Sequence, residues 1–138
     1  MASPSVVSIS PEDTGIFSVK EISVSSRTAL NQILQENHDR YHPFFNDKGF
    51  HNHITHYMLA AYALGAEQEQ LQRAWVQEKV FQRPQRPLNE QNVVQLKDDL
   101  FFLDCLGKEE FYHDFRIFFQ QQINDKGTGA VINEYVFA

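Results

Sequence analysis

A chain of 138 residues, 42% hydrophobic and 13% aromatic, has enough apolar side chains to bury one core. Its formal net charge of -6, with scattered Lys and Arg, excludes nucleic acid and an anionic membrane surface as the main partners. A single cysteine, Cys105, excludes an intramolecular disulfide, and no apolar run is long enough to span a bilayer. These features predict a cytoplasmic protein.

Residues 1–26 differ in composition from the rest of the chain. Ser and Val are frequent there, and Pro4, Pro11 and Gly15 interrupt regular structure. We therefore predict an extended or mobile N-terminal arm. The partial alternation of apolar and polar residues at 16–24 is also compatible with one short strand.

Apolar residues take up helical spacing after Ser26, which predicts an all-α, irregular multi-helix fold for residues 27–138. Ser26 is a suitable N-cap for the first helix, and Pro43 ends it. A second helix is expected at residues 51–64, with Gly65 after its C-terminus.

A third helix is expected at residues 67–81, in which Trp75 is a candidate anchor between helices. Beyond a proline-containing connector, the pattern predicts helices at residues 89–96 and 108–124, with further apolar segments at 99–106 and 130–137, and four to six helices in all. The chain stops within the last of these, without a polar tail or a cap. We therefore expect it to be a piece of a longer protein, with Val136, Phe137 and part of the Phe118–Phe119 face open or covered by another chain.

The most specific local pattern is the motif HNHITH at residues 51–56. On a helix, His53 and His56 would share one face at i, i+3, which allows two imidazoles to bind one metal ion, with His51 at the helix start. Neutral imidazoles suit iron, zinc or copper. The alternative is a hydrogen-bonded, partly buried pair without a metal. Further ligands would have to come from His113, from carboxylates elsewhere, or from chain outside this sequence.

Other catalytic templates fail. Cys105 stands in an apolar run and is expected to be a core residue rather than a nucleophile. No serine stands in a Gly-x-Ser-x-Gly elbow. The Gly-x-Gly at residues 127–129 follows an expected helix and lacks the third glycine, so it is no dinucleotide fingerprint. The phenylalanines between Phe111 and Phe119 are expected to form core rather than a ligand pocket.

Three segments together resemble the opening of the questin oxidase-like family: RYHPFF at residues 40–45, GFHNHITH at 49–56 and AAYALGA at 60–66. The resemblance covers about residues 27–138. Supporting matches lie at residues 69–74, 82–84, 112–127 and 131–135.

This resemblance implies a largely helical fungal enzyme that oxidises or opens aromatic polyketides such as anthraquinones. The implied reaction is a Baeyer-Villiger-type oxygen insertion that uses NADPH and no flavin-binding fingerprint. It also implies a non-haem iron bound mainly by histidines, for which His53 and His56 are the first candidates and His51 a further one. Members of the family are several times longer, so residues 27–138 are expected to be the N-terminal part of a larger enzyme domain.

Two functions follow as alternatives. The first is an oxygenase for an aromatic polyketide, with its catalytic residues unassigned and its remaining ligands in a C-terminal portion or a second copy of the chain. The second is a non-catalytic relative that serves as a helical scaffold or interaction module. Metal content distinguishes the two.

Overall fold

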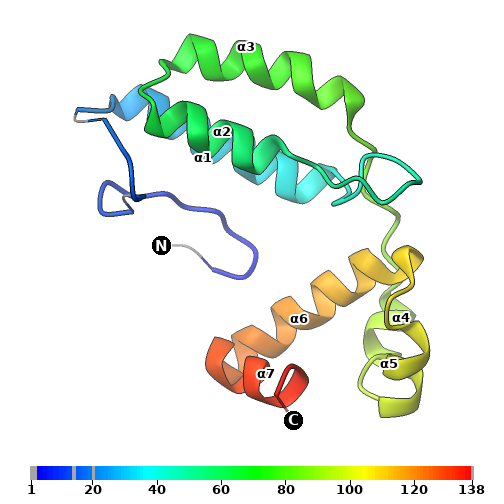
Figure 1. The fold of residues 1–138 in the computed structure, drawn as a ribbon. Helices are drawn as coiled ribbons and strands as arrows, with labels where there is room; N and C mark the ends of the chain where they lie inside the picture. Colours follow the sequence, from blue (N-terminus) through cyan, green and yellow to red (C-terminus); the bar gives the residue numbers. More distant parts are fainter. Residues whose placement is uncertain (1–2, 14, 20, 138) are drawn as a thin grey trace. The chain divides into compact units, whose positions relative to one another are not determined.

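The computed structural model describes residues 3–13, 15–19 and 21–137. Within these ranges it contains seven α-helices, where four to six were expected, and no β-strand, which confirms the predicted all-α fold. The helices are α1 (Val24–Arg40), α2 (Ile54–Ala63), α3 (Gln68–Glu78), α4 (Glu90–Gln95), α5 (Asp99–Cys105), α6 (Tyr112–Lys126) and α7 (Thr128–Tyr135), with 3-10 turns at Lys79–Phe81 and Glu109–Phe111 (Figure 1).

The chain divides into two compact units, unit 1 (Met1–Gln85) and unit 2 (Arg86–Ala138). The division falls inside the proline-containing connector at residues 83–87. The domain boundary predicted between residues 26 and 27 is a different one, and α1 begins ahead of it, at Val24.

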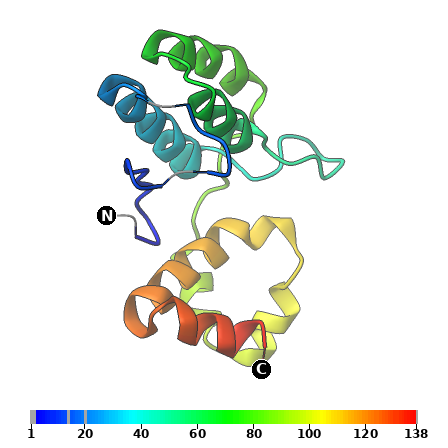
Figure 2. The ribbon, with the colours of Figure 1, turned by 60° about the vertical axis from the view of Figure 1, so that its left-hand side comes forward.

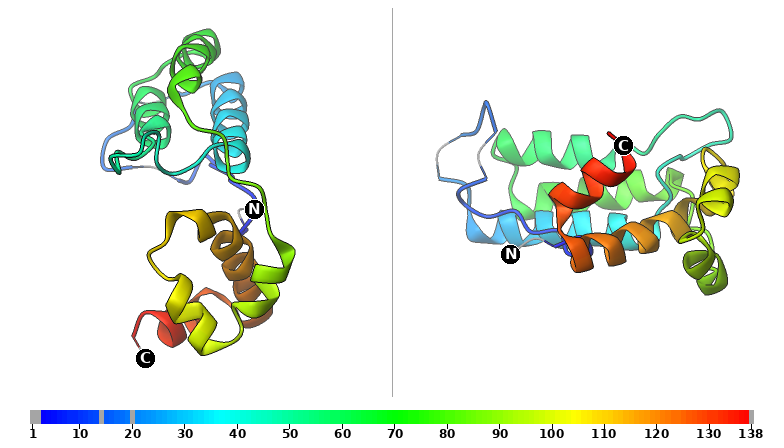
Figure 3. Two further views of the ribbon diagram at one scale, coloured as in Figure 1. Left: turned by 90° about the vertical axis from the view of Figure 1, so that its right-hand side faces the viewer. Right: turned by 90° about the horizontal axis from the view of Figure 1, so that it is seen from below.

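Unit 1 is built from α1, α2 and α3, seen nearly end-on in the left view of Figure 3. Apolar residues at helical spacing on all three helices meet in one core. Trp75 is 6% exposed in this core, and its ring meets that of Tyr41 edge to face at 5.6 Å, which confirms the predicted anchor. The other core residues are Ala29, Leu30, Ile33, Leu34, Ile54, Met58, Tyr62 and Leu71.

The start of α1 differs from the prediction. Ser23 is the N-cap, and its Oγ accepts a hydrogen bond from the Ser26 N–H at 3.1 Å. The predicted N-cap, Ser26, is wrong: it is a buried residue of the first turn. The helix ends at Arg40, ahead of Pro43, as predicted.

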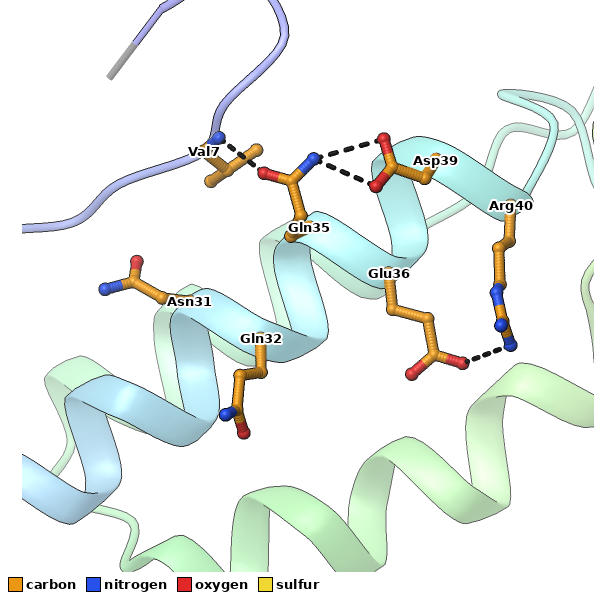
Figure 4. A pocket seen from close by; sticks show the side chains of 7 residues that line it. All are labelled: Val7, Asn31, Gln32, Gln35, Glu36, Asp39 and Arg40. Carbon is orange, nitrogen blue, oxygen red and sulfur yellow. Dashed lines mark hydrogen bonds and ion pairs between the residues drawn. The ribbon is translucent and has the colours of Figure 1, made fainter. Parts of the chain in front are cut away.

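The N-terminal arm is held along α1 by side-chain amides. The Val7 N–H donates to Gln35 Oε1 at 2.8 Å (Figure 4), and the Ile9 N–H donates to Asn31 Oδ1 at 2.7 Å. Asn31 Nδ2 donates back to the Ile9 carbonyl at 3.1 Å, so two amides satisfy arm backbone groups that have no sheet partner. The described residues of 16–24 form no strand, and Lys20 lies outside the described residues.

Unit 2 consists of α4 to α7, and α7 turns back against α6 after Gly127 (Figure 2). Phe118 of α6 is fully buried, which confirms the predicted core role of this helix. Cys105 is fully buried too, and burial raises the pKa of its thiol, so it is the expected core residue and not a nucleophile. The remaining members of this core are Val93 and Leu96, with Phe101, Phe102, Phe111, Phe115, Ile117, Phe119 and Tyr135 packed against it.

The end of the described chain exposes apolar side chains. Val136 is 68% exposed and Phe137 is 76% exposed, as predicted. The prediction that part of the Phe118–Phe119 face lies open is wrong at Phe118, whose side chain is fully buried. None of the helices formed by the described residues combines the length and the apolar character that a membrane span requires.

Candidate functional site

The first half of the histidine motif, residues 51–53, lies on the loop between α1 and α2, because α2 begins only at Ile54. The predicted helix start at residue 51 is therefore wrong. The Asn52 side chain explains the difference: its Oδ1 accepts the Ile54 N–H at 2.9 Å, an Asx-type turn that competes with helix. His53 is the residue that precedes the helix, and His56 lies in the first turn.

The loop doubles back on itself, so that its two arms pair. Phe44 and His51 form an antiparallel bridge, and the Asn52 N–H donates to the Pro43 carbonyl at 2.6 Å. The turn between the arms is the predicted one at residues 46–49, which ends at Gly49 with φ +79°. This backbone pairing fixes where the His51 side chain leaves the loop.

The rings of His51, His53 and His56 come together. The Nε2 atoms of His51 and His53 are 3.2 Å apart, and the ring centroids are 4.5 Å apart. The centroid of the His56 ring lies 6.3 Å from that of His51 and 6.2 Å from that of His53. The closest pair is thus His51 and His53, not His53 and His56.

This separation fits a shared metal ion. Imidazole nitrogens bind zinc at about 2.0–2.1 Å, so two of them at tetrahedral positions lie about 3.3 Å apart. The same distance also fits a hydrogen bond between two neutral imidazoles. In the part of the chain that the structure describes, no group of three or more His, Cys, Asp or Glu side chains is arranged to hold an ion. The pair therefore offers two positions of a larger donor set.

His113 lies in unit 2, where both of its ring nitrogens contact other residues. Its Nδ1 lies 2.6 Å from the Arg86 carbonyl oxygen, and its Nε2 lies 3.0 Å from Arg116 Nη2. Its two ring nitrogens thus both have protein partners, which indicates a structural role for the residue that the sequence offered as a further ligand.

A pocket of about 270 Å³ adjoins His53. Its walls come from the loop, from α2 and from the end of α3, and most of the lining is apolar. Its volume is slightly below the roughly 300–1,000 Å³ of typical small-molecule sites. His53 lines it, together with Phe45, Ile54, Tyr57, Glu78, Phe81 and Gln82.

Glu78 is the carboxylate among the lining residues, and the sequence interpretation did not select it as a site residue. Leu71, Trp75 and Glu78 follow one another at helical spacing, and the first two are buried. A carboxylate that continues the buried face of a helix is the signal that identifies it.

A sequence model of the family described as "Questin oxidase-like" matches residues 50–138. The chain is 39% identical over 138 residues to a questin oxidase of Aspergillus terreus, in an alignment that covers 100% of the chain and 31% of that protein. It is 39% identical over 132 residues to the Baeyer-Villiger oxidase ptaJ of Pestalotiopsis fici, covering 96% of the chain and 30% of that protein. It is 34% identical over 138 residues to the oxidoreductase AflY of Aspergillus parasiticus, covering 99% of the chain and 28% of that protein. The chain thus spans about a third of the length of these curated relatives.

Proposed function

The chain belongs to the questin oxidase-like family, and we propose that it supplies the N-terminal helical part of an oxygenase for an anthraquinone-like polyketide of fungal secondary metabolism. The names of the relatives support oxygen insertion of the Baeyer-Villiger type. One structural observation supports particular residues: the Nε2 atoms of His51 and His53 lie 3.2 Å apart, and His53 lines a pocket with aromatic walls.

The proposed reaction inserts one atom of dioxygen between a carbonyl carbon and its neighbouring carbon, which gives an ester whose hydrolysis opens the ring. The second oxygen atom leaves as water, with a hydride equivalent from NADPH, which becomes NADP⁺, and one proton from solvent. The described residues form no strand that leads into a glycine-rich turn and a helix, so they contain no dinucleotide-binding motif of that kind. No step is therefore assigned to NADPH within this chain.

In this proposal His51 and His53 would hold a non-haem iron, with the neighbouring His56 as the third candidate. Iron bound there would supply the activation of dioxygen. Phe45 and Phe81 on the pocket wall would contact the face of a flat ring.

Glu78 adds a polar group to this wall. A carboxylate among apolar side chains can accept a hydrogen bond from a phenolic hydroxyl and so orient the ring.

The test is the iron content of the longest available form of the protein. We expect His51→Ala and His53→Ala to lose bound iron and turnover of an anthraquinone, with helicity retained in circular dichroism. His38→Ala, which changes a histidine of α1 outside the motif, is the control and keeps both. Undiminished iron and activity in His51→Ala and His53→Ala would reject the assignment.

The non-catalytic alternative rests on a separate observation. Leu100, Leu103 and Leu106, in and just after α5, are all more than half exposed, which suits a scaffold that packs against another protein surface. Iron-free wild-type protein without turnover, together with self-association that Leu103→Asp abolishes in gel filtration, would favour this alternative.

A further inference from the structure

We infer that Arg83, outside the histidine motif, is a positioning residue that sets the separation of the His51 and His53 ring nitrogens. The inference rests on the proposed function, in which these two histidines are metal ligands. Arg83 lies beyond α3, at the start of the connector, more than thirty positions from His51 in the sequence. Its influence on His51 passes through the folded loop.

The guanidinium of Arg83 binds one arm of that loop at three places. Its Nε donates to the Phe44 carbonyl at 2.9 Å, and its Nη1 pairs with Asp47 Oδ1 at 2.8 Å. Its Nη2 lies 3.2 Å from His42 Nδ1, which also accepts the Phe44 N–H at 3.0 Å. Each of the three guanidinium nitrogens thus has its own partner between residues 42 and 47.

The backbone around Arg83 is tied to the same arm. The His42 N–H donates to the Arg83 carbonyl at 3.0 Å, and the Gln85 N–H donates to the Arg40 carbonyl at 2.7 Å. The ring of His42 is only 1% exposed. A guanidinium whose own backbone is anchored has little freedom, so the position of Phe44 is well determined.

Phe44, which Arg83 holds in place, in turn determines the backbone position of His51. It forms the antiparallel bridge with His51, and the adjacent pair of residues is held by the hydrogen bond from the Asn52 N–H to the Pro43 carbonyl. A shift of Phe44 therefore moves the His51 backbone, and with it the Nε2 atom that lies 3.2 Å from His53 Nε2. Residues that orient metal ligands from outside the coordination sphere act in this way.

Lysine cannot replace this function. A guanidinium presents five N–H donors in a rigid plane, whereas an ammonium group is a compact charge on a flexible stem. Asp47 matters less than Phe44, because the Asp47 side chain is 96% exposed and an exposed ion pair contributes little. Arg83→Lys should therefore release the loop, while Asp47→Asn should leave it in place.

The experiment compares wild type, Arg83→Lys, Arg83→Gln and Asp47→Asn in the 138-residue chain. Arg73→Lys, an exposed change on α3, is the matched control. Two quantities are measured on each protein: the nuclear Overhauser contact between the ring protons of His51 and His53, and the affinity for zinc alone. We expect both Arg83 variants to lose the contact and to bind zinc about 10- to 100-fold more weakly. Asp47→Asn and Arg73→Lys should resemble wild type in both measurements.

The ring contact does not require bound metal. It therefore tests the positioning role of Arg83 separately from metal binding by His51 and His53. Wild type and His51→Ala with equal zinc affinity would contradict the metal pair, while the ring contact still tests Arg83. Arg83 variants that keep the contact and the wild-type affinity would overturn the inference. Loss of helicity in both Arg83 variants would also overturn it, because Arg83 would then determine the fold and not the ring separation.

Discussion

Gly65 closes α2 in a conformation that suits glycine. Its φ is +88°, its N–H donates to the Tyr62 carbonyl at 2.9 Å, and the Ala66 N–H donates to the Ala61 carbonyl at 2.9 Å. This is the Schellman arrangement, and it confirms Gly65 as the residue that ends the helix. A Cβ at this position would lie 2.9 Å from Cγ2 of Val19 in the arm.

We predict that Gly65→Ala lowers the free energy of unfolding by more than the roughly 1–2 kcal/mol that a left-handed backbone costs an L-residue. The reason is the added contact with Val19. Gly49→Ala is the control, since Gly49 has a similar φ of +79° and a new Cβ there would meet nothing within 4 Å. Urea denaturation measures both variants, and equal losses would show that the Val19 contact is unimportant.

Cys105 makes the stability of unit 2 sensitive to alkaline pH. Burial raises the pKa of its thiol above the ordinary value of 9.0. The unfolded chain therefore loses this proton at lower pH than the folded chain does, and the free energy of unfolding falls as pH rises from about 9. Cys105→Ala should be less stable at neutral pH because of the lost packing, but should show a smaller further loss between pH 7.5 and 9.5. Parallel losses in thermal denaturation would refute this.

The histidines show how far the sequence could predict the site. The motif HNHITH could be recognised in the sequence, but the close approach of the His51 and His53 rings could not. Helical spacing selected His53 and His56, whereas the Asn52 turn delays the helix and the pairing of Phe44 with His51 brings His51 to His53. The Arg83 side chain also donates to the Phe44 carbonyl, a contact between residues 39 positions apart that no local pattern contains.

At the scale of elements, the spacing of apolar residues predicted which segments are helical, but it did not predict where each helix begins and ends. The phenylalanine pattern of α6 predicted a core helix, because its 3.6-residue period is independent of tertiary context. The start of α1 was missed because several serines in one stretch can each cap a helix, and Ser23 is the one that does. The amide contacts of Asn31 and Gln35 with the arm link residues more than 20 positions apart, so the sequence pattern could not reveal them.

Phe118 tests the role of α6. Its side chain is fully buried and meets the rings of Phe102, Phe119 and Tyr135. We predict that Phe118→Ala lowers the free energy of unfolding of unit 2 by about 3–5 kcal/mol, the usual cost of such a cavity. Phe137→Ala, at a side chain 76% exposed, should cost far less. Similar urea midpoints for the two variants would contradict the described core.

At the scale of the whole molecule, the sequence predicted the family, but it did not predict which residues would complete the set of metal donors around the histidine motif. The segments at residues 40–45, 49–56 and 60–66 pointed to the family that the comparison supports over residues 50–138. The relatives are about three times as long as this chain, and its described residues form no complete set of metal donors. The cytoplasmic location and the use of NADPH remain predictions from composition and family resemblance.

The central claim is that His53 and its neighbour His51 serve an oxygenase. Its most direct test is the source of the oxygen atom that a full-length protein inserts into an anthraquinone, followed by mass spectrometry under labelled dioxygen. We predict one labelled atom in the ester product of wild type and no product from His53→Ala, with helicity unchanged. Label taken up from water instead, or full incorporation by His53→Ala, would contradict the claim.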